Sequence, residues 1–150
     1  MIKKIVKPFL ALLLVGAAVT ASANPFLLSA DKRIDVVKVY LHDLQMADVH
    51  GITSLFVANG RVISTSQGCV NAAAFFNSFL PEIKSAKVTI NHIYQSIDNK
   101  DHYSASFNFS WVMRDGSQSG GHYIDEFIFH KGTNKLVTVS MFENTKIRSS

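Results

Sequence analysis

The chain has 150 residues and a formal net charge of +4, and 47% of its residues are hydrophobic. Without Lys3, Lys4 and Lys7 it carries 12 basic and 11 acidic residues, a net charge of +1. Those remaining basic residues are scattered, whereas a nucleic-acid interface needs a basic stripe. We therefore expect no nucleic-acid partner, and one domain with one hydrophobic core.

Residues 1–23 have the pattern of a cleavable signal peptide. The three lysines precede an apolar run that ends near Val19, and Ala21-Ser22-Ala23 matches the small-residue cleavage site. The apolar run is shorter than the roughly 20 residues that a membrane-spanning helix needs. We predict that the mature chain is a single domain over residues 24–150, is periplasmic or secreted, and has no membrane attachment. An anchoring helix that stays uncleaved is the alternative.

Two helices are predicted at the start of the mature domain. Asp31 is a favourable N-cap for a helix that reaches about Ala47. Apolar residues recur along it every three or four positions, with Tyr40 on the same side, so one stripe faces the core. Asp48 is the predicted N-cap of a shorter second helix, which Asn59-Gly60 ends.

A third helix is predicted from about Val70 to Leu80, where Pro81 stops it. Cys69 would lie at its start. A reactive thiol is one interpretation of a single cysteine, but free cysteines are usually buried, so we expect a small buried hydrophobe. No intrachain disulfide can form.

The last third of the chain predicts strands. From Tyr103 to Met113, apolar and polar residues alternate, so this strand has one apolar and one polar face. The other predicted strands are Arg61–Ser64, Val88–Ile97, His122–His130 and Leu136–Phe142. Helices followed by a run of strands indicate an α+β fold, with three N-terminal helices packed on a strongly curved antiparallel sheet.

Several segments, taken in order, resemble the NTF2-like (SnoaL-like) superfamily, which has a ketosteroid-isomerase-like cone fold, in an exported bacterial form. They are Tyr40-Leu-His-Asp-Leu-Gln-Met-Ala-Asp48, Ile52-Thr-Ser-Leu-Phe-Val-Ala-Asn-Gly60, Gly68-Cys-Val-Asn-Ala-Ala-Ala-Phe-Phe76, Tyr123-Ile-Asp-Glu-Phe-Ile-Phe129 and Lys135-Leu-Val-Thr-Val-Ser-Met-Phe142. The resemblance covers about residues 31–143 and implies a homodimer built on the sheet. Members of this superfamily include isomerases, cyclases, dehydratases and non-catalytic proteins, so the fold does not supply the function.

The resemblance to the steroid isomerases of this superfamily implies a specific site. Tyr40 matches their tyrosine and Asp125 their late-strand acid, which can stay protonated in an apolar pocket and donate a hydrogen bond. Asp125 in a structural ion pair is the alternative. The position of the catalytic base falls at Ser64 or Thr65, and neither can act as a base near neutral pH without activation. We therefore expect a protein without catalytic activity, and an enzyme is the alternative.

Aromatic residues of the predicted strands line the expected ligand pocket, together with Tyr40 and Asp125. The full predicted set is Tyr40, Phe107, Phe109, Trp111, Tyr123, Asp125 and Phe127. His92 is a further catalytic candidate, because members of the superfamily often place a pocket histidine at this position. The six histidines show no metal-ligand spacing, so neither a metal nor another cofactor is expected.

Three functions remain open. The leading one is a non-catalytic exported module whose aromatic pocket holds a small apolar ligand. The second is an isomerase-, cyclase- or dehydratase-type enzyme that uses Tyr40, Asp125 and His92. The third is a periplasmic interaction module whose outer sheet face contacts another protein. The apolar residues predicted for that outer face are Val112, Ile124, Ile128 and Val139.

Overall fold

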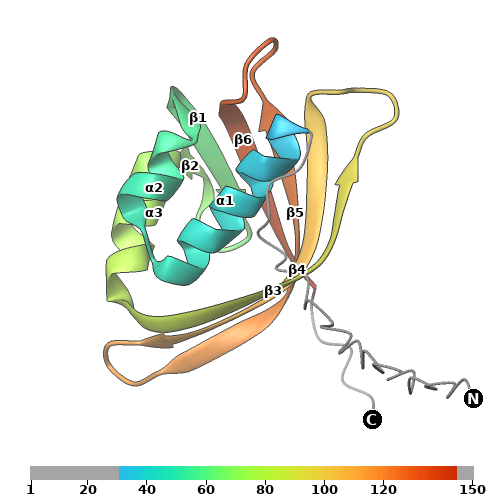
Figure 1. Cartoon of the computed structure of the whole chain (residues 1–150). Helices are drawn as coiled ribbons and strands as arrows, with labels where there is room; N and C mark the ends of the chain where they lie inside the picture. The colour runs from blue at the N-terminus through green and yellow to red at the C-terminus, as the bar shows by residue number, and fades with distance from the viewer. Residues whose placement is uncertain (1–30, 145–150) are drawn as a thin grey trace, which may run out of the picture.

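Helices pack inside a strongly curved six-stranded sheet in the computed structural model, which describes residues 31–144 (Figure 1). The helical elements are α1 (Lys32–Met46), α2 (Val49–Ser54), α3 (Ala72–Phe79) and the 3-10 helix η1 (Leu80–Glu82). The strands are β1 (Phe56–Ser64), β2 (Gly68–Asn71), β3 (Ile83–Gln95), β4 (His102–Met113), β5 (Gln118–Phe129) and β6 (Leu136–Asn144). The predicted signal peptide lies outside the described residues. None of the helices in residues 31–144 is long and apolar enough to cross a membrane.

The two predicted N-caps are confirmed. The carboxylate of Asp31 accepts a hydrogen bond of 2.9 Å from the backbone N–H of Arg33, and Asp48 accepts one of 2.9 Å from Gly51. Between the two helices, Ala47 takes a left-handed conformation with a φ of 52°. The chain can therefore reverse within two residues, because each end of the turn is satisfied by a local hydrogen bond.

The prediction that Asn59-Gly60 ends the second helix was wrong. That helix ends at Ser54, and Asn59-Gly60 lies inside strand β1. A Cβ atom at Gly60 would lie 2.8 Å from the side chain of Phe56, so the glycine permits a close approach within the strand. The pairing register of β1 with β6 shifts between Phe56 and Arg61, which places this irregularity at the same point.

The expected start of the third helix and the burial of Cys69 were also wrong. The segment from Gly68 to Asn71 forms edge strand β2, which pairs with β1 in an antiparallel hairpin and leaves Cys69 exposed. The helix begins at Ala72, because the side chain of Asn71 caps it by accepting a hydrogen bond of 3.2 Å from the N–H of Ala74.

The strands form one sheet in the order β2-β1-β6-β5-β4-β3. The α+β class and the helices on one face of a curved sheet are confirmed. One pair departs from the expected antiparallel sheet, since β1 runs parallel to β6. A parallel pair needs a long connection, and here the whole of α3, β3, β4 and β5 lies between the two strands.

The alternating strand from Tyr103 to Met113 is confirmed as β4. Its odd-numbered side chains from Tyr103 to Phe109 are buried, and those of Trp111 and Met113 are half-buried. The neighbouring strands β3 and β5 both begin earlier than predicted, at Ile83 and Gln118. The turn between β4 and β5 contains Gly116 at a φ of 88°.

The helices and the inner sheet face form an aromatic core. Tyr40 of α1 lies 5.0 Å from Phe127 of β5 and 6.0 Å from Phe76 of α3, measured between ring centroids. All three side chains are fully buried. Each edge-to-face pair of this kind contributes about 0.5–1.5 kcal/mol beyond its buried area, and the two pairs join α1 to α3 and to β5.

We call the opposite, solvent-facing side the outer sheet face. Ile124 of β5 and Phe142 of β6 are direct cross-strand partners there and are 44% and 55% exposed. Val112 and Ile128 are half-buried on the same face. The assignment of Val139 to this face was wrong, because Val139 pairs with Phe127 and is fully buried in the core.

Candidate functional site

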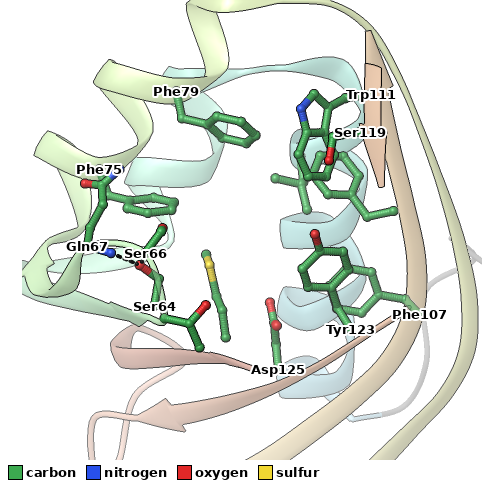
Figure 2. A pocket seen from close by; sticks show the side chains of 14 residues that line it. Ser64, Ser66, Gln67, Phe75, Phe79, Phe107, Trp111, Ser119, Tyr123 and Asp125 are labelled. Atoms are coloured by element: carbon green, nitrogen blue, oxygen red, sulfur yellow. Dashed lines mark hydrogen bonds between the residues drawn. The ribbon is translucent and has the colours of Figure 1, made fainter. Parts of the chain in front are cut away.

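A cavity of about 280 Å³ lies between α3 and the β1–β2 turn on one side and strands β4 and β5 on the other (Figure 2). Thr65, Ser66 and Gln67 of the turn and Ser119 of β5 line it and are exposed, which places its polar edge at these residues. This volume is close to the lower end of the ~300–1,000 Å³ range of ligand pockets. The cone is therefore not filled by its own side chains.

Aromatic rings form the cavity walls on both sides. Helix α3 contributes Phe75 and Phe79, and the sheet contributes Trp111 and Tyr123 (Figure 2). Phe79 and Trp111 meet edge to face at a centroid distance of 5.6 Å, which joins the helix wall to the sheet wall. Phe107 stacks on Tyr123 at 5.8 Å and continues the wall toward Asp125. These contacts give a nearly continuous apolar lining.

Asp125 is the carboxylic acid of the cavity, and its side chain points into it (Figure 2). The residue is 2% exposed, and its Oδ1 atom has no hydrogen-bond partner among the described residues. Burial raises the pKa of Asp125 well above its ordinary value. The anticipated alternative, an ion pair of Asp125, is absent from residues 31–144.

Tyr40 does not line the cavity, although it was expected there. It packs in the core against Phe127, at 5.0 Å between ring centroids, and its hydroxyl group is buried without a hydrogen-bond partner among the described residues. Burial, and secondarily the charge of Asp125, raise the pKa of Tyr40 well above its ordinary value. Tyr123 is the tyrosine that shares the cavity with Asp125. Of the seven expected pocket residues, five line the cavity: Phe107, Phe109, Trp111, Tyr123 and Asp125.

The position of the catalytic base in the isomerase comparison does lie at the cavity. Ser64 and Thr65 both line it. The Ser64 hydroxyl accepts a hydrogen bond of 3.1 Å from the backbone N–H of Gln67, so it stabilises the β1–β2 turn. Among the described lining residues, Asp125 is the single carboxylic acid and no histidine or lysine is present. One acid can hold or donate a proton, but a proton shuttle between two substrate atoms needs a second group.

His92 lies away from the cavity, so its expected place in the pocket was wrong. It is exposed and pairs with Ser106 of β4, and its ring lies 5.7 Å from that of Tyr94. A register shift between Ile90 and His92 turns the side chain to the outer sheet face. Within residues 31–144, no group of three or more His, Cys, Asp or Glu side chains is arranged to hold a metal ion.

Several lining residues were not anticipated from the sequence. Phe75 and Phe79 lie one helical turn apart on α3. That i, i+4 pair was the available signal for the helix wall of the cavity. No local signal indicated Leu44, Ser119 or Met141, because their position depends on how the sheet curves around α1.

No protein-family model matches the chain, and no curated protein matches it. Solved structures do match. An NTF2-like protein of unknown function from Burkholderia pseudomallei aligns with a TM-score of 0.61 at 11% identity, over 76% of this chain and 92% of that one. A protein with a ketosteroid isomerase-like fold from Catenulispora acidiphila, in complex with trimethylamine, aligns with a TM-score of 0.62 at 11% identity, over 74% and 86%.

A third match is SalBIII, described as an epoxide hydrolase/cyclase-like enzyme in pyran ring formation in the polyether salinomycin. Its TM-score is 0.64 at 14% identity, over 76% of this chain and 92% of that one. These similarities show that the chain has the NTF2-like, ketosteroid isomerase-like fold. At such low identity they carry the fold and not the activity.

Proposed function

We propose that this protein binds a small, mainly apolar molecule in the cone cavity, with Asp125 as the polar anchor of the ligand. The observation that carries the proposal is the unpaired, 2% exposed carboxylic acid at the base of an aromatic cavity. A buried polar group without a partner costs about 1–3 kcal/mol. A ligand that supplies the missing hydrogen bond or charge recovers that free energy, so the site favours occupancy.

The structural neighbours support a small-molecule function. One was crystallised with trimethylamine, and another is described as a cyclase-like enzyme. Both describe proteins of the same fold that handle small molecules. Their different functions are consistent with a shared fold in which the residues that line the cavity determine which ligand binds.

An acid-catalysed reaction is the second candidate function, because burial inside the cavity raises the pKa of Asp125 and favours its protonated form. The isomerase-type mechanism is disfavoured for two reasons. Ser64 and Thr65 occupy the position of the catalytic base, and Tyr40 is not among the residues that line the cavity. We therefore favour binding without catalysis.

Export and self-association belong to the same proposal. The signal-peptide pattern of residues 1–23 supports a periplasmic or secreted location. The paired apolar side chains of Ile124 and Phe142 on the outer sheet face support a homodimer, as an isologous contact would bury both patches at once.

Fluorescence of Trp111 tests the binding function directly, because Trp111 is the single tryptophan of the chain and lines the cavity. The uncharged probe N-phenyl-1-naphthylamine should quench Trp111 emission in a saturable manner. Thr65→Phe, which places a ring at the cavity edge, should weaken binding, and Ser110→Phe on exposed β4 surface is the control. Equal binding by both variants and the wild-type protein would contradict the proposal.

A further inference from the structure

The described lining of the cavity contains one acidic side chain and no basic one. Asp125 is the acid among the lining residues, and no lysine, arginine or histidine is found among them. An anionic ligand would therefore find no counter-charge. Asp125 can either keep its proton and face a neutral ligand, or lose it and face a cation.

The walls are chemically suited to a cation. The described lining contains six aromatic side chains, and the rings of Phe79, Trp111 and Tyr123 follow one another at centroid distances of 5.6 Å and 6.5 Å. Phe75 continues this arc at 6.3 Å from Phe79 (Figure 2). Ring faces attract a cation within about 6 Å, and aromatic cages recognise alkylated ammonium groups in this way.

Asp125 lies at the right place to complete such a cage. It is two residues from Tyr123 on the same strand and on the same inner face, a separation of about 6.6–7 Å along β5. An alkylammonium group in contact with the Asp125 carboxylate is thus within reach of the Tyr123 ring, on which Phe107 stacks at 5.8 Å. No cationic side chain of the described lining competes for the carboxylate.

We propose that the cavity ligand is a small alkylated amine in its cationic form, held between the Asp125 carboxylate and the aromatic walls. This inference rests on the proposed binding function and specifies the class of its ligand. The methyl or alkyl groups of the amine fill the apolar space, and the polar edge formed by Thr65, Ser66, Gln67 and Ser119 accommodates a hydroxyl or other neutral end.

Binding of such a cation is an exchange of charge. Burial raises the pKa of Asp125 and so favours its protonated form in the empty site; at pH values below that pKa, the ammonium enters as the Asp125 proton leaves to solvent. The titratable groups next to Asp125 are Tyr40 from α1 and Tyr123 from β5, and burial and the charge of Asp125 raise the pKa of Tyr40. At pH values below the pKa of Asp125, the affinity for a permanent cation should therefore increase about tenfold for each unit by which the pH is raised.

A matched pair of probes separates the two ligand classes. Choline carries a trimethylammonium group, and 3,3-dimethylbutan-1-ol is its uncharged isostere of the same shape. Calorimetric titration of the wild-type protein at several pH values should show choline as the tighter ligand by about tenfold or more near pH 8. Its affinity should fall as the pH is lowered through the pKa of Asp125, and heats measured in different buffers below that pKa should reveal proton release, approaching one proton per choline bound.

Two variants assign the effect to the cage. Asp125→Asn should remove the preference for choline and its pH dependence but retain the neutral alcohol. Tyr123→Leu, which removes the ring two residues from Asp125 on β5, should weaken choline by roughly 3- to 30-fold, the range of a cation–π contact, with a smaller effect on the alcohol. Circular dichroism checks that both variants are folded, and the wild-type pH series stands without them.

The outcomes distinguish the two proposals. If the alcohol binds as tightly as choline near pH 8, or if choline binds more tightly at low pH than at high pH, the amine assignment is wrong and the binding function stands. If neither choline, the alcohol nor N-phenyl-1-naphthylamine binds at millimolar concentration, both proposals are overturned.

Discussion

The charge of Asp125 contributes to raising the pKa of Tyr40, after burial, yet the Tyr40 hydroxyl is not hydrogen-bonded to Asp125 or to any other described residue. Asp125 opens into the cavity, whereas Tyr40 is fully buried behind it. The two side chains therefore cannot both donate a hydrogen bond to one ligand oxygen unless the core residues around Tyr40 rearrange. The site presents one acid, and its chemistry follows from that acid.

Replacing Asp125 tests whether it is unpaired. Asp125→Leu removes a buried polar group without stranding a partner, so the free energy of unfolding should rise by about 1–3 kcal/mol near neutral pH. Asp125→Asn should stay within about 1 kcal/mol of the wild-type protein. Urea denaturation measures both. Losses of about 3–5 kcal/mol in both variants would instead indicate a stranded charged partner.

The pH dependence of stability has a defined sign. The folded pKa of Asp125 lies above its unfolded value of about 3.8, so the folded state binds more protons in the window between them. Stability from this group is present below that window and is lost as the pH rises through the folded pKa. The wild-type protein should therefore lose stability relative to Asp125→Asn as the pH rises from about 4 through the folded pKa of Asp125. Burial also raises the pKa of Asp43, but this group is present in both proteins and cancels in the difference. A pH-independent difference in urea midpoints would contradict the assignment.

Arg33 joins the start of α1 to two hairpin turns. Its guanidinium donates hydrogen bonds to the Asp101 carboxylate at 2.6 Å and to the Thr133 carbonyl at 2.9 Å, and it lies 5.1 Å from the ring centroid of Phe129. Lysine cannot reproduce this fork, so Arg33→Lys should cost about 1–3 kcal/mol. Lys32→Ala, at the exposed neighbouring position, should change stability by at most ~0.5 kcal/mol. Equal urea midpoints for the two variants would show that the fork contributes nothing.

The outer sheet face is the predicted homodimer contact. Ile124→Asp places a charge beside exposed Phe142, so it should convert a dimer into a monomer while the cavity still binds its probe. Light scattering at micromolar concentration measures the mass. His92→Ala lies on the same exposed face and away from the cavity, and it should leave probe affinity unchanged. A monomeric wild-type protein would remove the dimer from the account.

Local signals predicted the features that depend on local contacts. Asp31 and Asp48 cap their helices through hydrogen bonds to residues two and three positions ahead in the sequence. The alternation of apolar and polar residues from Tyr103 to Met113 indicates which face of the strand is buried. The sequence alone could not show that Gly68–Asn71 is a strand, because a four-residue edge strand exists only through its pairing with β1.

The candidate site divides in the same way. Strand alternation placed Phe107, Trp111 and Asp125 on the inner face, which the structure bears out. The prediction for His92 was wrong because the register shift after Ile90 reverses the faces on which the following residues lie. No local sequence signal indicates this register shift. Tyr40 was correctly placed in the core stripe of α1, but which core residues border the cavity depends on tertiary packing.

The most direct measurement is the titration of the Asp125 carboxyl carbon by nuclear magnetic resonance, with Asp125→Asn to assign the signal. In the empty protein, the account predicts a midpoint well above the ordinary value of 3.8, because the buried acid has no partner among the described residues. Saturating choline should lower that midpoint as the carboxylate gains a counter-charge. A midpoint at or below 3.8 in the empty protein, unchanged by choline, would contradict both the unpaired acid and its role as the ligand anchor.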